Sequence, residues 1–307
     1  MISASPDSSN PSGATTPTSP AWDPEALDRE YNPRLRVPDA PQLMARWSER
    51  SRATRARLRD AHGGRHAPME LAYGAGPKER LDLFPSGRAN APLLVFIHGG
   101  YWRMLDKDDF SSIAPAYCER GVTVAVPNYD LVPAVPMETI VRQMLAALAY
   151  LWREAPALGF DRGRIVVAGH SAGGHLAAML ACARWPDWAP GLPADLVRAV
   201  LPISGLYDLE PLRHAPFLAR DIALDAQRAR RLSPAFMTPA PGVRVVSAVG
   251  GDESDAFHHQ NRLLAERWPG AFERDVPMPG CDHFSVCERL ADPDSALFEA
   301  AMQLCDA

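Results

Sequence analysis

The sequence predicts an α/β protein whose sheet is mostly parallel, doubly wound and covered by helices on both faces. From Met69 onward, short apolar runs alternate with longer helix-forming stretches, which is the order produced by repeated strand–helix–strand units. The first strands can form an antiparallel edge. Predicted strands cover residues 69–73, 80–84, 93–97, 122–126, 164–169, 197–203, 243–249 and 272–276, and predicted helices cover 110–120, 137–154, 171–183, 254–268 and 294–304.

One catalytic domain is the simplest organisation for this chain. An α/β fold of about 250 residues routinely forms a single domain, so we expect one over residues 23–307. Residues 1–22 are rich in Ser, Pro and Thr and are expected to be a disordered tail. Residues 23–66 should form a helical segment packed on the body by its apolar side. Residues 205–241 interrupt the alternation, and they are either a small cap over the site or a helical excursion without substrate contact.

Composition excludes several classes of partner. The chain has 307 residues, 47% of them apolar, with a formal net charge of −5, so neither a nucleic-acid nor a membrane partner is expected. No stretch reaches the ~18 continuous apolar residues of a membrane span, and the N-terminus lacks the pattern of a secretory signal. The five cysteines are scattered and expected to be reduced. A cytoplasmic protein is predicted, and a homodimer is the candidate assembly.

The most informative motif is a Gly-His-Ser-Ala-Gly turn at residues 169–173. An apolar strand precedes it and a helix-forming stretch follows it, which is the context of a nucleophile elbow. The turn would hold Ser171 in a strained conformation with its hydroxyl exposed. A side chain at Gly169 or Gly173 would collide where strand and helix meet closely.

Backbone donors for an oxyanion are predicted upstream of this turn. The strand at 93–97 runs directly into His98-Gly99-Gly100-Tyr101-Trp102. Glycines there let backbone N–H groups point into a site, so Gly99, Gly100 and the N–H of Ala172 are the predicted oxyanion donors. His98 is interpreted as structural.

The base and the acid are expected further along the chain, because the order in this fold is Ser, acid, His. His283, on a loop after the last predicted strand, is the candidate base. Asp252 and Glu253 both follow the strand at 243–249 and could accept the imidazole N–H. Their spacing does not separate them.

Seven segments together resemble the α/β-hydrolase type of kynurenine formamidase, or arylformamidase. The resemblance runs from about Leu27 to the C-terminus and is carried by residues 29–33, 79–85, 98–102, 169–175, 202–209, 250–257 and 282–284. It implies Ser171 as nucleophile, His283 as base and Glu253 as acid, although other members carry Asp at that last position. Asp252 stays an alternative.

The predicted activity is hydrolysis of a small acyl or formyl group, most readily from an aryl formamide, with no cofactor and no metal. Tyr101, Trp102 and Phe284 are the candidate substrate-binding residues. Either Arg103 or Arg213 could pair with a substrate carboxylate, although a surface role is the simpler interpretation. The alternatives are a general carboxylesterase and a hydrolase-like binding module. His62 and His66 have a metal-ligand spacing, but Gly63-Gly64 weakens the helix that would present both.

Overall fold

The computed structural model describes residues 23–60 and 67–306. The predicted tail at 1–22 and the pair His62 and His66 lie outside the described residues. Strands within the described part form one eight-stranded sheet in the order β1-β2-β4-β3-β5-β6-β7-β8. Their bounds are β1 (Met69–Ala72), β2 (Arg80–Phe84), β3 (Ala91–Ile97), β4 (Thr123–Pro127), β5 (Phe160–His170), β6 (Ala199–Ile203), β7 (Arg244–Gly250) and β8 (Phe272–Met278).

The pairing confirms the predicted fold class. Strands β1 and β2 pair antiparallel, as do β2 and β4, and this edge is the antiparallel one that the sequence allowed. Every later pairing, from β4 with β3 through to β7 with β8, is parallel. All carboxyl ends of the parallel strands therefore meet at one edge, where such sheets bind their ligands.

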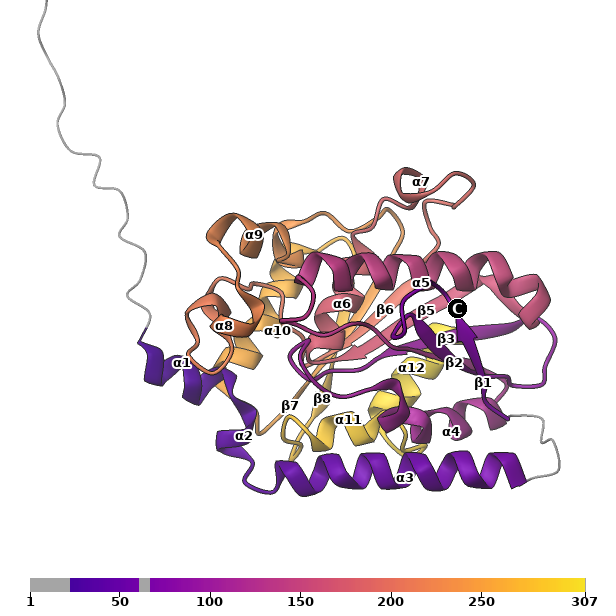
Figure 1. Ribbon diagram of the computed structural model, residues 1–307, viewed down its shortest axis with the longest axis horizontal. Helices are drawn as coiled ribbons and strands as arrows, with labels where there is room; N and C mark the ends of the chain where they lie inside the picture. Colours follow the sequence, from indigo (N-terminus) through magenta and orange to yellow (C-terminus); the bar gives the residue numbers. More distant parts are fainter. Residues whose placement is uncertain (1–22, 61–66, 307) are drawn as a thin grey trace, which may run out of the picture.

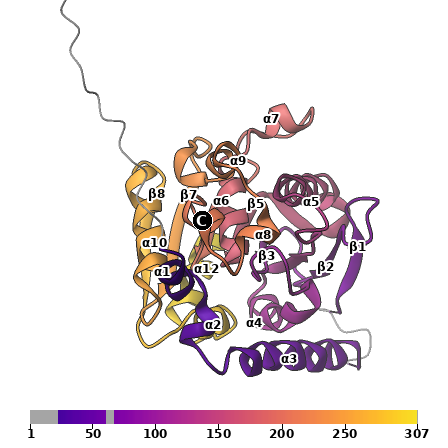
Figure 2. The same cartoon turned by 60° about the vertical axis from the view of Figure 1, so that its left-hand side comes forward.

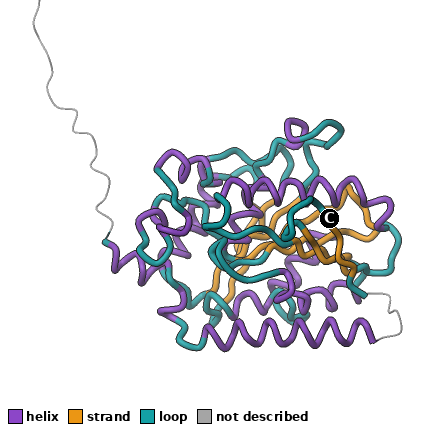
Figure 3. Tube along the Cα trace, viewed as in Figure 1, coloured by secondary structure: helices purple, strands orange, loops and turns teal. Residues whose placement is uncertain are grey.

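Helices cover both faces of the sheet. Figures 1 and 3 show the strands as a middle layer, with α5 and α6 on one side and α3, α4, α11 and α12 on the other. The larger helices are α3 (Ala40–Asp60), α5 (Met137–Leu158), α6 (Ala172–Ala181), α10 (Asp255–Arg267) and α12 (Ala296–Asp306). The predicted helix at 110–120 is divided into a 3-10 turn η1 (Lys107–Ile113) and α4 (Ala114–Glu119).

Two hydrophobic cores result from the alternation of side chains along the central strand β3. Leu93, Val95 and Ile97 pack in one core, which includes residues of α5, α6 and α10. Leu94 and Phe96 pack in the other core, with residues of α3, α4 and α12. All five are fully buried, and complete burial of such a side chain contributes about 1.5–3 kcal/mol. The strand is apolar throughout because both of its faces are covered.

The N-terminal segment forms three helices on the outside of this body. Helices α1 (Pro24–Tyr31) and α2 (Pro33–Arg36) lie close to α10, and the long α3 then runs below α4 (Figure 2). Leu43 and Trp47 of α3 are buried in the second core, and Met44 and Leu58 are partly buried against it. This packing by the apolar side is the one the sequence predicts.

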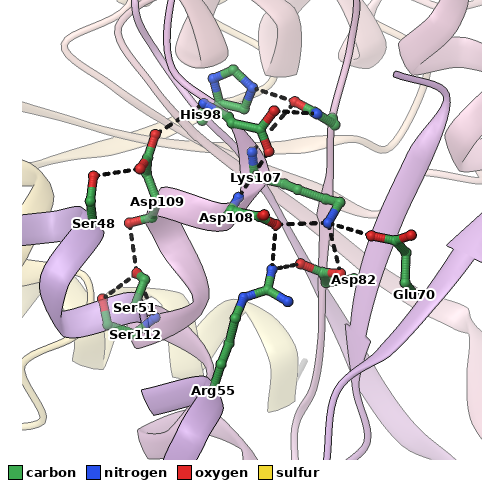
Figure 4. Close-up of polar contacts among 12 residues, drawn as sticks. Ser48, Ser51, Arg55, Glu70, Asp82, His98, Lys107, Asp108, Asp109 and Ser112 are labelled. Carbon is green, nitrogen blue, oxygen red and sulfur yellow. Dashed lines mark hydrogen bonds and ion pairs between the residues drawn. The ribbon is translucent and has the colours of Figure 1, made fainter. Parts of the chain in front are cut away.

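A cluster of charges, in which Asp82 and Lys107 are buried and Asp108 is exposed, connects α3 to the sheet (Figure 4). Arg55 of α3 pairs with Asp82 of β2 and with Asp108, and Lys107 pairs with both of these carboxylates. Desolvation raises the pKa of Asp82 even though both cations oppose that shift. Such buried ion pairs add little net stability, but loss of one partner is costly. The cluster therefore fixes the position of α3.

The interrupting segment at 205–241 is mainly short turns. It contains η2 (Pro211–His214), α8 (Ala219–Ile222), α9 (Ala226–Arg231) and η3 (Pro234–Phe236). Two further short helices that the sequence did not indicate are α7 (Trp185–Trp188) and α11 (Ser285–Arg289). No helix among the described residues is long and apolar enough to cross a membrane.

Candidate active site

Ser171 occupies the sharp turn between β5 and α6. Its backbone has φ 55° and ψ −116°, a region that a residue with a side chain rarely adopts and that stores strain. The Ser171 N–H donates to the carbonyl of Ile203 at 2.8 Å, which holds the turn against the end of β6. This is the geometry of a nucleophile elbow.

The elbow leaves no room for side chains at its two outer glycines. A Cβ at Gly169 would lie 2.1 Å from the carbonyl oxygen of Gly173, and a Cβ at Gly173 would lie 2.0 Å from the carbonyl oxygen of Ile97. Both distances are far below van der Waals contact. The collisions expected from the sequence are therefore present.

The structure brings Ser171, His283 and Glu253 together although 112 positions separate the first two. Nε2 of His283 lies 3.1 Å from Oγ of Ser171, and Nδ1 of His283 lies 2.6 Å from Oε2 of Glu253. With Nδ1 donating to the carboxylate, Nε2 is free to accept the serine proton. All three residues are buried, with relative exposures of 2%, 4% and 7% in that order.

The second oxygen of Glu253 has its own donors. Oε1 accepts the hydroxyl hydrogen of Ser204 and the backbone N–H of Gly250, the latter at 2.8 Å. The neighbouring Asp252 is exposed, and its side chain makes no hydrogen bond or ion pair within the described part of the chain. Of the two carboxylates that the sequence left open, Glu253 is thus the one that contacts the imidazole.

The predicted oxyanion donors lie beside the serine. A Cβ on Gly99 would be 3.2 Å from Cβ of Ser171, so the Gly99 backbone runs directly alongside it. Gly100 has φ 102°, and Ala172 is the first residue of α6, where a backbone N–H lacks an intrahelical partner. No other described residue accepts a hydrogen bond from the N–H groups of Gly99, Gly100 or Ala172.

The histidines around the elbow are structural. His98 is fully buried, and its ring contacts the Gly99 carbonyl at 2.8 Å and the Asn128 side chain at 3.2 Å. Burial lowers the pKa of His98 and lowers that of His170 well below its usual range. His170 is therefore neutral, and its Nε2–H donates to the carbonyl of His283 at 2.7 Å. That bond helps to hold the base loop, a role the sequence did not reveal.

A pocket with about 490 Å³ of empty space opens onto Ser171 and His283. Tyr101 and Phe284 line it, as the sequence predicts. Trp102 does not, because a left-handed backbone at this residue (φ 57°) turns the indole inward, where it is fully buried against His175. The prediction of Trp102 as a substrate-binding residue is therefore corrected.

The N-terminal segment supplies part of the pocket wall, which the sequence reasoning missed. Asn32, Pro33 and Arg34 line the pocket together with Met44 and Trp47 of α3. The apolar spacing of Met44 and Trp47 along the helix predicted burial of that face, but no local signal showed which part of the body it would meet.

The interrupting segment contributes one side chain to the pocket, that of Phe217. Tyr207, Leu212 and Leu218 are instead buried in the first core. Among the described residues, no group of three or more His, Cys, Asp or Glu side chains is arranged to hold a metal ion.

Comparison with known proteins identifies relatives over most of the chain. The family model BD-FAE matches residues 81–213. Kynurenine formamidase of Salmo salar is 26% identical over 80% of this chain and 84% of its own length, and that of Drosophila melanogaster is 28% identical over 88% and 93%. A solved structure from a Silicibacter species, described as a proposed thioesterase, is 34% identical with a TM-score of 0.78, covering 89% of this chain and 97% of that one.

The chain belongs to the α/β-hydrolase superfamily. Within that superfamily it is a hydrolase of the arylformamidase or esterase type, and kynurenine formamidases are relatives over most of its length. The predicted resemblance is confirmed.

Proposed function

We propose that the protein is a serine hydrolase that removes a formyl or small acyl group from an aryl amine, with N-formylkynurenine as the expected substrate. The observation that carries this proposal is the pair of short contacts made by His283, to Ser171 on one ring nitrogen and to Glu253 on the other. The kynurenine formamidase relatives support the substrate class.

The first half of the reaction forms an acyl-enzyme. Nε2 of His283 accepts the hydroxyl proton while Oγ of Ser171 bonds to the carbonyl carbon. The carbonyl oxygen becomes an oxyanion that the N–H groups of Gly99, Gly100 and Ala172 stabilise. When the tetrahedral intermediate collapses, the bond to the aryl nitrogen breaks and His283 returns the proton to that nitrogen.

The second half releases the acyl group. A water molecule attacks the formyl ester of Ser171 while His283 accepts a proton from it. The second intermediate expels Oγ, which regains the proton, and formate leaves. Glu253 keeps its hydrogen bond to Nδ1 throughout and stabilises the imidazolium in both halves. These steps use only this chain's own side chains and backbone, so we propose a metal-independent reaction without a cofactor.

Substrate comparison tests this proposal. We expect kcat/KM for N-formylkynurenine to exceed that for p-nitrophenyl acetate, and Ser171→Ala to abolish both activities while the folded structure is retained. Activity should survive exhaustive chelation of metal ions. Equal or greater preference for the acetyl ester would favour a general carboxylesterase, since the same serine chemistry serves both bond types. A protein that binds these compounds but hydrolyses neither would be a binding module.

The domain organisation, the compartment and the assembly of the protein are also proposals. We propose that residues 23–306 act as one domain in which the segment 205–241 forms a small cap, supported by the position of Phe217 in the pocket wall. The five cysteines are free and buried, which supports a reducing compartment such as the cytoplasm. Small-molecule substrates are the proposed partners, and a homodimer is the assembly to test by light scattering.

A further inference from the structure

Arg34 places a positive charge at the open end of the pocket without a carboxylate to neutralise it. The side chain is exposed, whereas Ser171 at the inner end is 2% exposed. Its Nη2 contacts the sulfur of Met104 at 2.9 Å and the sulfur of Met44 at 3.9 Å. A thioether is a weak acceptor, and none of the described residues forms an ion pair with Arg34. Its charge therefore remains available to a ligand.

The other arginines considered for this role are already paired. Nη1 of Arg103 donates to the carbonyl of Phe217 at 2.6 Å and to Asp221 at 2.5 Å. Arg103 therefore connects the pocket wall to the segment 205–241. Arg213 contacts Glu210 at 2.8 Å. These two arginines already have carboxylate partners, so a substrate carboxylate would have to meet a different arginine.

The remaining pocket wall matches a ligand that is aromatic with one anionic end. Of the described residues that line the pocket, none is an aspartate or glutamate, and Tyr101, Phe217 and Phe284 give it aromatic walls. The side-chain amide of Asn32 also lines it and has no hydrogen-bond partner in the described part of the chain. It is a second donor on the same segment as Arg34.

The segment that carries Arg34 is fixed relative to the reacting groups. The carbonyl of Glu30 accepts the hydroxyl of Ser254 at 2.5 Å, and the carboxylate of Glu30 accepts the N–H of Ala256 at 3.0 Å. Ser254 directly follows Glu253, so the loop that supplies the acid also holds the segment carrying Arg34. A group held in place before binding loses less entropy when the ligand arrives.

We propose that Arg34 is a specificity residue that binds a carboxylate on the substrate, so that the enzyme prefers aryl formamides or esters with an anionic side chain. This inference rests on the proposed function for its substrate class. The guanidinium offers the planar pair of donors that a carboxylate accepts. Arg34 would contact the end of the substrate that is far from the scissile bond, so it would change substrate affinity and not the chemical step.

The test measures binding apart from turnover. In a Ser171→Ala background, calorimetry gives Kd for N-formylkynurenine and for its methyl ester, which lacks the negative charge. We expect the acid to bind about tenfold more tightly than the ester, the effect of one charge-assisted contact. Arg34→Met should remove this preference by weakening the acid alone, and Arg34→Lys should retain part of it. Raised ionic strength should reduce it as well.

A matched control is available on the next helix. Arg46 is an exposed arginine of α3 that does not line the pocket, and Arg46→Met should leave both Kd values unchanged. Equal affinity for acid and ester, or equal losses for both ligands in Arg34→Met, would overturn the role of Arg34. Turnover by the wild type separates the two proposals. If the acid and the ester are hydrolysed with equal kcat/KM and bind with equal Kd, the hydrolase function stands and the carboxylate-binding role of Arg34 is overturned. If the acid binds preferentially but neither compound is hydrolysed, the role of Arg34 stands and the hydrolase function is overturned.

Discussion

The hydroxyl of Ser204 donates to Oε1 of Glu253, the carboxylate oxygen that faces away from His283. Ser204 follows the last residue of β6 and has a left-handed backbone with φ 48°, and its N–H is held by the carbonyl of Ala248 at 2.8 Å. The carboxyl end of β6 therefore sets the orientation of Glu253, the acid that follows β7. Ser204 is a positioning residue that acts on the reacting groups through Glu253.

Loss of the Ser204 hydroxyl should slow the chemical step. Ser204→Ala leaves Oε1 with one donor fewer, and a hydrogen bond to a charged group is worth about 1.5–3 kcal/mol. We expect kcat to fall by about tenfold with KM nearly unchanged, and steady-state kinetics measure this split. A purely structural role would instead lower the thermal midpoint without changing kcat below that midpoint.

Replacing each of the adjacent carboxylates Asp252 and Glu253 by its amide should have very different effects on kcat. Glu253→Gln keeps the size of the acid but favours the wrong imidazole tautomer, and such a change costs about 10⁴ in kcat in a serine triad. We expect a loss of about 10³–10⁴ for Glu253→Gln, measured as kcat. The control is Asp252→Asn at the exposed neighbour, which should keep nearly full activity. A larger loss in Asp252→Asn than in Glu253→Gln would reassign the acid.

A methyl group at the elbow should disrupt the fold. In Gly173→Ala the new Cβ would lie 2.0 Å from a backbone oxygen of β3, and the strand cannot move because it is buried on both faces. We expect a loss of stability of more than about 3 kcal/mol, at the upper end for single substitutions. Chemical denaturation measures it. Gly270→Ala is the matched control because a Cβ there meets nothing within 4 Å, and similar stability in both variants would refute the packing at the elbow.

Acidification should destabilise the protein through its buried histidines. Burial lowers the pKa of His175 to about 4, and it lowers those of His98 and His170. At these three histidines the unfolded chain binds more protons than the folded one, so their contribution to stability is full above pH ~6.5 and is lost as pH falls toward 4. His175 alone accounts for about 3 kcal/mol of this loss by pH 4. Denaturant midpoints across this range should fall steadily, and an unchanged midpoint would contradict the neutral buried state.

Local signals in the sequence predicted most of the sheet and the elbow. Strand β3 is a short apolar run, and β2 alternates charged and apolar residues. The glycines at 169 and 173 belong to a five-residue motif that is recognisable in the sequence alone. The choice of Glu253 rather than Asp252 as the acid could not be predicted from the local sequence. It depends on Ser204 and Gly250, which both donate to the same carboxylate oxygen of Glu253.

The composition of the pocket was the least predictable feature. Arg34 comes within contact distance of both Met44 and Met104 only because the N-terminal helices pack over the carboxyl ends of the strands. Sequence spacing does not encode that docking. Trp102 lies in the region that the motif predicts, but the left-handed backbone of its turn sets the direction of the side chain, and the motif does not encode that direction.

Covalent labelling of Ser171 by a fluorophosphonate tests the central claim most directly. Mass spectrometry of the digested protein should find the label on the peptide that contains Ser171, with no labelling of Ser171→Ala and labelling at least about 10³-fold slower in His283→Gln. Such a result shows that the imidazole 3.1 Å from Oγ makes this hydroxyl reactive. Labelling at another serine, or an equal rate in His283→Gln, would contradict the account.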